Sequence, residues 1–143
     1  MGIDILYKAI AAECRLAVPE LKKVCRDNMP QNAETPFILV LITDTDTRRC
    51  LANRQRVKQS FDVQYFPGGE IQNRRKECER VKQEMLRGFD VISADGISFY
   101  VKEKNANVTD DVLHLLFSVS YVEYREPAQP KMEELSKNIE VEE

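Results

Sequence analysis

The sequence predicts an α+β domain in which two amphipathic helices pack on one face of a mainly antiparallel sheet. Two observations lead to this class. Helical and strand-like periodicities follow one another along the chain in the order helix, strands, helix, strands. The later strand segments are also long enough to pair with each other as hairpins. A chain of 143 residues fits one such domain, and at this size folding buries about 70% of the surface without help from disulfides or metals.

Each predicted helix carries one apolar stripe. Residues 3–18 space apolar side chains three and four positions apart, and Pro19 stops the segment. Residues 70–89 carry a second stripe among many charges, and Gly88 suits the cap at its end. The two stripes consist of Ile3, Leu6, Tyr7, Ile10, Cys14 and Ala17, and of Ile71, Cys78, Val81, Met85 and Phe89.

Between the helices the pattern predicts three strand-like segments. Residues 21–26 form a short candidate before a stretch of turn-forming residues at 27–32. Residues 37–42 are apolar on both faces, which predicts a central strand covered on both sides. Residues 43–53 are polar and fit either a hairpin or a long flexible excursion. Residues 57–66 then alternate between apolar and polar side chains, as a half-buried strand does.

After the second helix the sequence predicts three more strands, at residues 90–92, 97–102 and 112–124. Ala94-Asp95-Gly96 is typical of a tight turn joining the first two. In the last strand the odd positions from Leu113 to Tyr121 are apolar, whereas the even ones include His114 and two serines. One face of this strand therefore belongs to the core, and the other is partly exposed.

The charge is unevenly distributed along the chain. The total is −3, from 21 basic and 24 acidic residues. Residues 126–143 hold six acids and two bases, net −4, so residues 1–125 carry a net +1. We therefore divide the chain into an α+β domain at 1–125 and an acidic C-terminal tail at 126–143.

Composition also excludes several classes of protein. The longest apolar run, residues 37–42, is far shorter than the roughly 20 residues that span a bilayer. The first residues lack the basic start and apolar stretch of a signal peptide, which predicts synthesis in the cytoplasm. The cysteines are widely spaced, without a C-x-x-C pair, and are expected to be reduced and mostly buried: Cys14, Cys25, Cys50 and Cys78.

No residue pattern indicates a catalytic centre, and we expect neither an enzyme nor a cofactor. His114 is the only histidine and lies within a predicted strand, where a structural role is expected. Asp44 and Asp46 form a D-x-D that could hold a divalent cation, but a polar turn explains them as well. Metal-dependent catalysis by this pair therefore remains a remote alternative.

The strongest charge feature is a basic segment without acids at residues 48–58. Such a segment can neutralise nucleic-acid phosphates, meet an acidic surface on a protein partner, or simply face solvent. The near-neutral body and the absence of tryptophan and of a known binding motif argue against nucleic acid. Its members are Arg48, Arg49, Arg54, Arg56 and Lys58.

Four segments resemble, in order, a phage tail terminator family of phages and phage-like particles of Gram-positive bacteria. The most specific is RQRVKQSFDVQYFP at residues 54–67, which resembles the family segment F-x-V-x-Y-F-P and the residues before it. An opening helix at 5–10, a P-F-I-L-V-L strand at 36–41 and D-x-V-L-H at 110–114 agree with it. Together the resemblance covers about residues 3–125.

The resemblance implies a structural role in a virion. The family is similar in plan to the lambda-type tail terminator, an α+β subunit that assembles as a six-fold ring. Such a ring caps the tail tube, ends its polymerisation, and presents a surface to head-completion proteins. The implied partners are other copies of the chain, the tube protein, neck proteins and, in a contractile tail, the sheath, with no membrane. The implied place is the tail neck of a virion, phage or bacteriocin-like, with DNA crossing the ring lumen without specific binding.

Two surfaces are expected to make these contacts. The basic segment would meet a neighbouring subunit, tube or sheath, and the tail would dock on a partner after assembly through acids at Glu133, Glu134, Glu140, Glu142 and Glu143. Another neck or head-completion ring protein is the alternative function, because small ring subunits of this kind share their architecture. A nucleic-acid-binding module or a metal-dependent enzyme is more remote.

Overall fold

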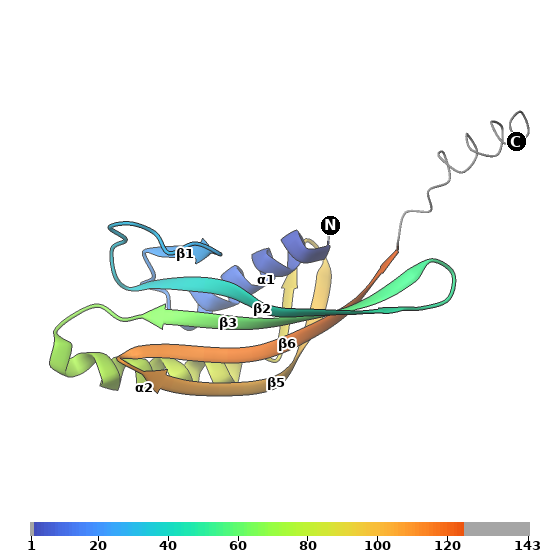
Figure 1. Cartoon of the computed structure of the whole chain (residues 1–143). Helices are drawn as coiled ribbons and strands as arrows, with labels where there is room; N and C mark the ends of the chain where they lie inside the picture. Colours follow the sequence, from blue (N-terminus) through green and yellow to red (C-terminus); the bar gives the residue numbers. More distant parts are fainter. Residues whose placement is uncertain (1, 125–143) are drawn as a thin grey trace, which may run out of the picture.

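The computed structural model describes residues 2–124 and contains two helices and six strands (Figure 1). The α+β class is confirmed. The elements, in chain order, are α1 (Gly2–Ala17), β1 (Lys23–Arg26), β2 (Phe37–Arg49), β3 (Arg54–Phe66), α2 (Ile71–Gly88), β4 (Val91–Ala94), β5 (Ile97–Thr109) and β6 (Val112–Tyr124). No helix within this described part of the chain is long and apolar enough to cross a membrane.

The six strands form one mixed sheet in the order β1-β2-β3-β6-β5-β4. The short edge strand β1 runs parallel to β2, and the other four pairs are antiparallel. The polar stretch after the apolar run is a hairpin and not a flexible excursion, because β2 continues through it to Arg49 and pairs with β3 as far as Gln55.

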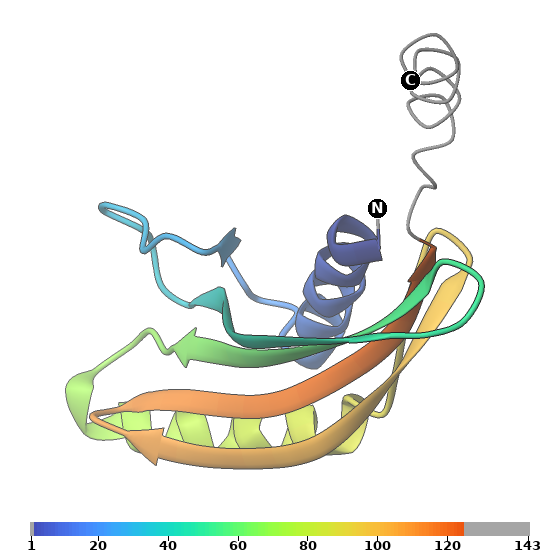
Figure 2. The same ribbon diagram turned by 45° about the vertical axis from the view of Figure 1, so that its right-hand side comes forward.

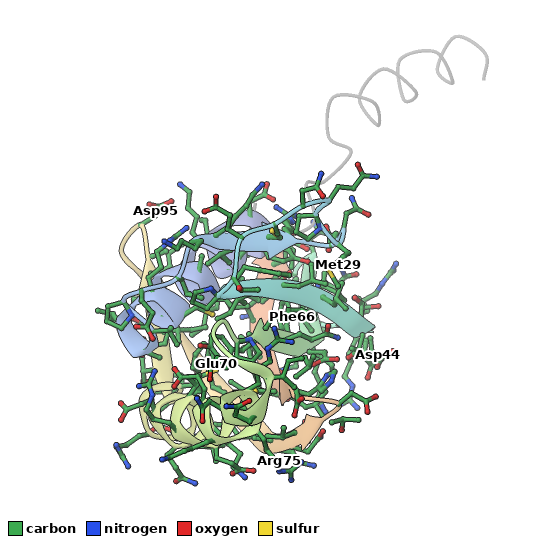
Figure 3. All side chains as sticks on the ribbon, turned by 90° about the vertical axis from the view of Figure 1, so that its left-hand side faces the viewer. Met29, Asp44, Phe66, Glu70, Arg75 and Asp95 are labelled. Atoms are coloured by element: carbon green, nitrogen blue, oxygen red, sulfur yellow. The ribbon has the colours of Figure 1, made fainter. Side chains whose placement is uncertain are left out.

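Both helices lie on the same face of the sheet, as Figure 3 shows from the end of the strands. The odd positions of β3 and β6 point toward them, and Phe61, Val63 and Leu115 are at most 1% exposed. Phe61 packs edge-on against Tyr7 of α1 and also contacts Phe117, with ring centroids 5.8 and 5.5 Å apart. The predicted stripes supply the helix side of this core, including Leu6, Ile10 and Cys14 from α1 and Cys78, Val81 and Met85 from α2.

The sheet curls around the helices because two of its strands carry irregularities at the same level (Figure 2). The register of β2 shifts between Ile42 and Asp44, opposite the centre of β3. The register of β5 shifts between Lys102 and Asn105, opposite the centre of β6. β-Bulges bend a strand and increase its twist, so these two shifts account for the curvature of the sheet.

Sequence patterning misplaced the ends of several strands. The predicted strands at 37–42 and 97–102 extend to Arg49 and Thr109. Burial on both faces holds only for Phe37–Val40 and ends at Leu41. The predicted tight turn is present, with Asp95 and Gly96 both at positive φ. The predicted acidic tail lies outside the described residues, and the division at residue 125 stays a prediction.

Candidate interaction surface

Beyond the helix-covered core, three strands continue together as an arm. We call this arm the ribbon and define it as residues 43–49 of β2, 54–60 of β3 and 118–124 of β6. In Figure 1 the β2–β3 hairpin extends past the part of the sheet that the helices cover. Every residue from Ile42 to Arg49 is exposed, so this part of β2 lacks a covering layer on either face. An arm with one uncovered polar strand is a candidate interaction surface.

The ribbon gathers four of the five predicted basic residues on one face. Val57 and Phe61 point toward the helices, so the even positions of β3 point away from them. Arg48 pairs with Arg56, and partners in an antiparallel pair share a face. We call the set Arg48, Arg54, Arg56 and Lys58 the basic face. Arg49 pairs with Gln55 and lies on the opposite side.

The arginines of the basic face are not held in ion pairs by the described residues, although the carboxylates of Asp44 and Asp46 lie on the same face of the ribbon. No ion pair within residues 2–124 involves Arg48, Arg54 or Arg56. Like charges directly opposite each other destabilise a strand pair, and Arg48 and Arg56 are such a pair. An arrangement that costs stability, and whose arginines form no ion pair within residues 2–124, is suited to an anionic partner.

On the side that faces the helices, a chain of hydrogen bonds joins the three strands at the root of the ribbon. Thr45 of β2 donates to Oε1 of Gln59 on β3 at 2.6 Å. The amide nitrogen of Gln59 donates to the hydroxyl of Tyr121 on β6 at 3.4 Å. Burial raises the pKa of Tyr121, which keeps the hydroxyl neutral. The root of the arm is therefore held in one arrangement before any partner binds.

A second set of contacts joins the strands on the opposite side. Ser118 of β6 donates to Oε1 of Glu103 on β5 at 2.6 Å, and Lys58 lies 3.1 Å from the same oxygen. These hydrogen bonds hold the pKa of Glu103 below its usual value. Lys58 is thus already partly neutralised, and the free charge of the basic face lies on its arginines.

The tip of the hairpin is a tight turn with an exposed apolar side chain. The amide of Arg54 donates to the carbonyl of Leu51 at 3.2 Å, and Ala52 and Asn53 both have φ of 61°. Two central residues at positive φ give the turn a twist that matches the flanking strands. The side chain of Leu51 is 82% exposed.

Sequence reasoning missed two exposed apolar residues of the ribbon and a third at the tip of its hairpin. Val122 and Tyr124 are exposed and lie beside Arg56 and Arg54 in the register of β3 and β6. The third, Leu51, is the only large apolar side chain in the mostly polar stretch at 43–53. The signal for the first two was available, because Val122 and Tyr124 are at even positions of the last strand, on the face that the pattern leaves partly exposed.

The other candidate residues have structural explanations. Nδ1 of His114 lies 3.2 Å from the carboxylate of Asp62 on the face away from the helices. Asp44 and Asp46 are exposed along β2 and pair in register with Ser60 and Lys58, and Figure 3 shows Asp44 on the side of the sheet opposite the helices. Within residues 2–124, no three His, Cys, Asp or Glu side chains are grouped so that they could hold a metal ion.

A groove of about 360 Å³ lies at the C-terminal end of β3. Its charged groups already form ion pairs or hydrogen bonds within the described residues. Arg80 forms ion pairs with Glu77 and with Glu20, the latter at 3.0 Å. The hydrogen bond from Arg80 lowers the pKa of Glu77, and burial raises that of Tyr65, whose hydroxyl donates to Glu77 at 3.5 Å. These side chains form an ion-pair and hydrogen-bond network. The network and burial explain the shifted pKa values of Glu77 and Tyr65 without a catalytic role. The acidic residues proposed for the tail lie outside the described residues.

The family comparison matches most of the chain. A family model described as phage tail terminator protein matches residues 5–131. The chain belongs to the phage tail terminator family. It is thereby a structural protein of phage tails by family, which argues against an enzyme. The match includes α1 from its fourth residue, the whole of α2, the whole ribbon and the first residues of the predicted tail, whereas residues 132–143 lie outside it.

A solved structure shows that the same fold occurs in an assembled particle. This terminator-family chain is similar to a chain of the structure titled "Virion of native gene transfer agent (GTA) particle", with a TM-score of 0.50 and 11% sequence identity. The alignment covers 82% of this chain and 95% of the other. At this identity the likeness is one of fold. The comparison with curated proteins returned no match.

Proposed function

We propose that this protein is the tail terminator of its particle, a ring that caps the tail tube, stops its polymerisation and presents the surface to which neck proteins attach. Family membership carries this proposal. In this proposal the plan is that of the lambda-type terminator, with six copies in the ring, the tube below, head-completion proteins above and, in a contractile tail, the sheath alongside. Ring subunits meet through two different patches, one on each neighbour.

The ribbon supports this proposal as the part of the subunit that reaches a neighbour. Its strands are longer than the core needs, and their root is fixed by hydrogen bonds on both sides. A pre-organised arm loses little conformational entropy on binding. Its charge would also speed and orient docking to an acidic surface at low ionic strength. We therefore assign Arg48, Arg49, Arg54 and Arg56, with Lys58, to a contact with a neighbouring subunit, tube or sheath.

Electron microscopy of particles made without this protein tests the function. The expected result is overlong or headless tails, because nothing stops polymerisation or joins the head. Normal-length tails beside unfilled heads would contradict the proposal and indicate a head-completion protein. The hexamer is checked by the mass of the purified protein in solution, which should be six times the 16.5 kDa of one chain.

Charge reversal tests the assigned surface. The triple variant Arg48→Glu, Arg49→Glu, Arg54→Glu should fold normally but fail to form rings or mature tails. A matched variant reverses three exposed bases outside the ribbon that form no ion pair among the described residues: Arg15→Glu, Lys22→Glu and Lys76→Glu. This control should assemble. Intact rings and tails from the first triple would show that these arginines are not the contact.

We propose in addition that the acidic tail docks on a partner after assembly. Deletion of residues 127–143 should leave the isolated ring intact and impair its joining to the rest of the particle. Normal particles from the truncated gene would rule this out.

A further inference from the structure

We propose that in the free subunit the acidic tail folds back onto the basic face of its own chain and covers it until an assembly partner displaces it. The significance for assembly rests on the proposed function, but the contact itself belongs to the isolated chain. Three observations carry it: the arginines of the basic face that form no ion pair within residues 2–124, the point at which the described chain ends, and the composition of the residues that follow.

The basic face has the composition and exposure expected of one side of an interface. Its arginines are exposed, none of them forms an ion pair within residues 2–124, and two lie directly opposite each other. Val122 and Tyr124 lie beside them and are 47% and 72% exposed. Guanidinium groups beside an exposed aromatic ring and an aliphatic side chain suit a segment that brings both carboxylates and apolar side chains.

The chain ends its described course beside this face. Tyr124, the last described residue, is the register partner of Arg54. The described chain therefore ends about one strand spacing, roughly 5 Å, from Arg54. The tail needs no long linker to reach it.

The tail has the complementary composition. Residues 126–143 carry six acids against two bases and include apolar Met132, Leu135 and Ile139. Residues 1–124, by contrast, hold 18 bases and 18 acids, net zero, so the tail is the acidic segment of this chain. Glu133 is nine residues beyond Tyr124, and nine extended residues span up to about 30 Å. The stretch from Arg54 to Lys58 needs only about 13 Å.

Covalent connection to the same chain allows a weak contact between the tail and the basic face to be highly populated. The few residues that join Tyr124 to the acids of the tail would hold those acids at a millimolar effective concentration near the basic face. Exposed ion pairs are individually worth little, so the tail binds strongly enough to cover the face and weakly enough to be displaced. Salt should release it, because the Debye length falls to about 3 Å at 1 M. An acidic partner surface in the ring would compete for the same arginines and displace the tail.

The contact is tested in the full chain by paramagnetic labelling of Cys50. This thiol is in the hairpin next to the basic face, whereas the other three cysteines are buried. A nitroxide attached there should broaden the amide signals of residues 131–140 in dilute protein at low salt. The broadening should disappear at about 0.5 M salt and in the variant Arg48→Gln, Arg54→Gln, Arg56→Gln.

Two results would overturn the proposal. The first is tail signals that are equally sharp with the nitroxide oxidised and reduced at low salt. The second is broadening that arises only when labelled chains are mixed with isotopically enriched unlabelled ones, which would place the tail on a second copy. Neither result depends on ring formation or tail length, so failure here is distinct from failure of the proposed function.

Heparin, used as a polyanion probe, tests whether the tail masks the arginines. The variant Glu133→Gln, Glu134→Gln, Glu140→Gln should bind heparin about tenfold more tightly at low salt than a control of equal net charge. The control is Glu34→Gln, Glu70→Gln, Asp110→Asn, whose sites are exposed and lie toward the other end of the sheet. Equal heparin affinities of the two variants would contradict masking, because net charge alone would then explain the tighter binding.

Discussion

The two halves of β3 belong to different environments although they form one continuous strand. In residues 61–66, alternate side chains are buried under both helices, with Phe61, Val63 and Tyr65 at most 1% exposed. In residues 54–60 the same alternation continues, but only Val57 and Gln59 are buried, and arginines occupy the other face. The same backbone thus contributes stability in one half and an outward-facing surface in the other. Substitutions should separate along this division.

The largest effect is expected in the core half. Phe61→Ala should lower the free energy of unfolding by about 3–5 kcal/mol, because it leaves a cavity between Tyr7 and Phe117. Chemical denaturation measures this. Arg54→Ala in the same strand is the control and should change stability by less than about 0.5 kcal/mol. Comparable losses from both would erase the proposed division.

Thiol reactivity should follow the same division. Cys50 in the hairpin should react with a thiol reagent at least about a hundredfold faster than the buried cysteines, because reaction at those requires opening of the core. Burial also raises the pKa of Cys14, and that of Cys78 to about 11, which keeps both as unreactive thiols at neutral pH. One fast and three slow thiols are expected, and Cys50→Ser should remove the fast phase.

Alkaline pH should destabilise the core side through its tyrosines. Burial, with a hydrogen bond to Asp27, raises the pKa of Tyr7 to about 12 from 10.0. Between these values the unfolded chain has lost the proton that the folded chain keeps, so stability falls as the pH rises from about 10 to 12. Tyr7→Phe should reduce this slope and, since the 3.0 Å hydrogen bond to Asp27 is lost, cost about 1 kcal/mol at pH 7.

The control for this variant is Tyr124→Phe in the ribbon, where the side chain is 72% exposed. Stability curves measured by denaturation at a series of pH values should be the same for this variant and the parent protein. A change in slope at Tyr124 equal to that at Tyr7 would contradict the assignment.

The smallest effect has the opposite sign. Arg56→Thr should raise stability by up to about 0.5 kcal/mol, because it removes the repulsion from Arg48 and places a good strand former in β3. The same change should weaken ring assembly if the basic face is an interface. An Arg56→Thr variant that is less stable than the parent protein and still assembles fully would contradict both expectations.

The periodicity of apolar residues was sufficient to predict the core but not the ribbon. The stripes of both helices and the odd positions of the last strand form the observed core, because burial requires those periods. The extension of β2 was left open between a hairpin and a flexible excursion, since an uncovered polar strand has no apolar alternation. The extension of β5 was missed because the register shift after Lys102 changes the phase of its apolar positions, which continue as Ala106 and Val108.

The candidate surface was only half predictable. The basic segment was visible as a run of charge, but its separation into Arg48 on one face and Arg49 on the other depends on register. The exposed Leu51, Val122 and Tyr124 were missed because an apolar residue is by default assigned to the core. Their exposure depends on where the helices stop, which local sequence does not determine.

The irregularity in β2 also fixes which arginine joins the basic face. Side chains alternate sides along a strand, so one additional residue reverses the phase of everything that follows. Thr43 is that additional residue, because Ile42 pairs with Phe61 and Asp44 with Ser60. Without the irregularity Thr43 would pair with Ser60, and every later pair would move by one residue. Arg48 would then pair with Gln55 and Arg49 with Arg54, so the two arginines would exchange faces without any change in composition. The single additional residue at the bend thus determines which charged side chains of the hairpin lie on each face.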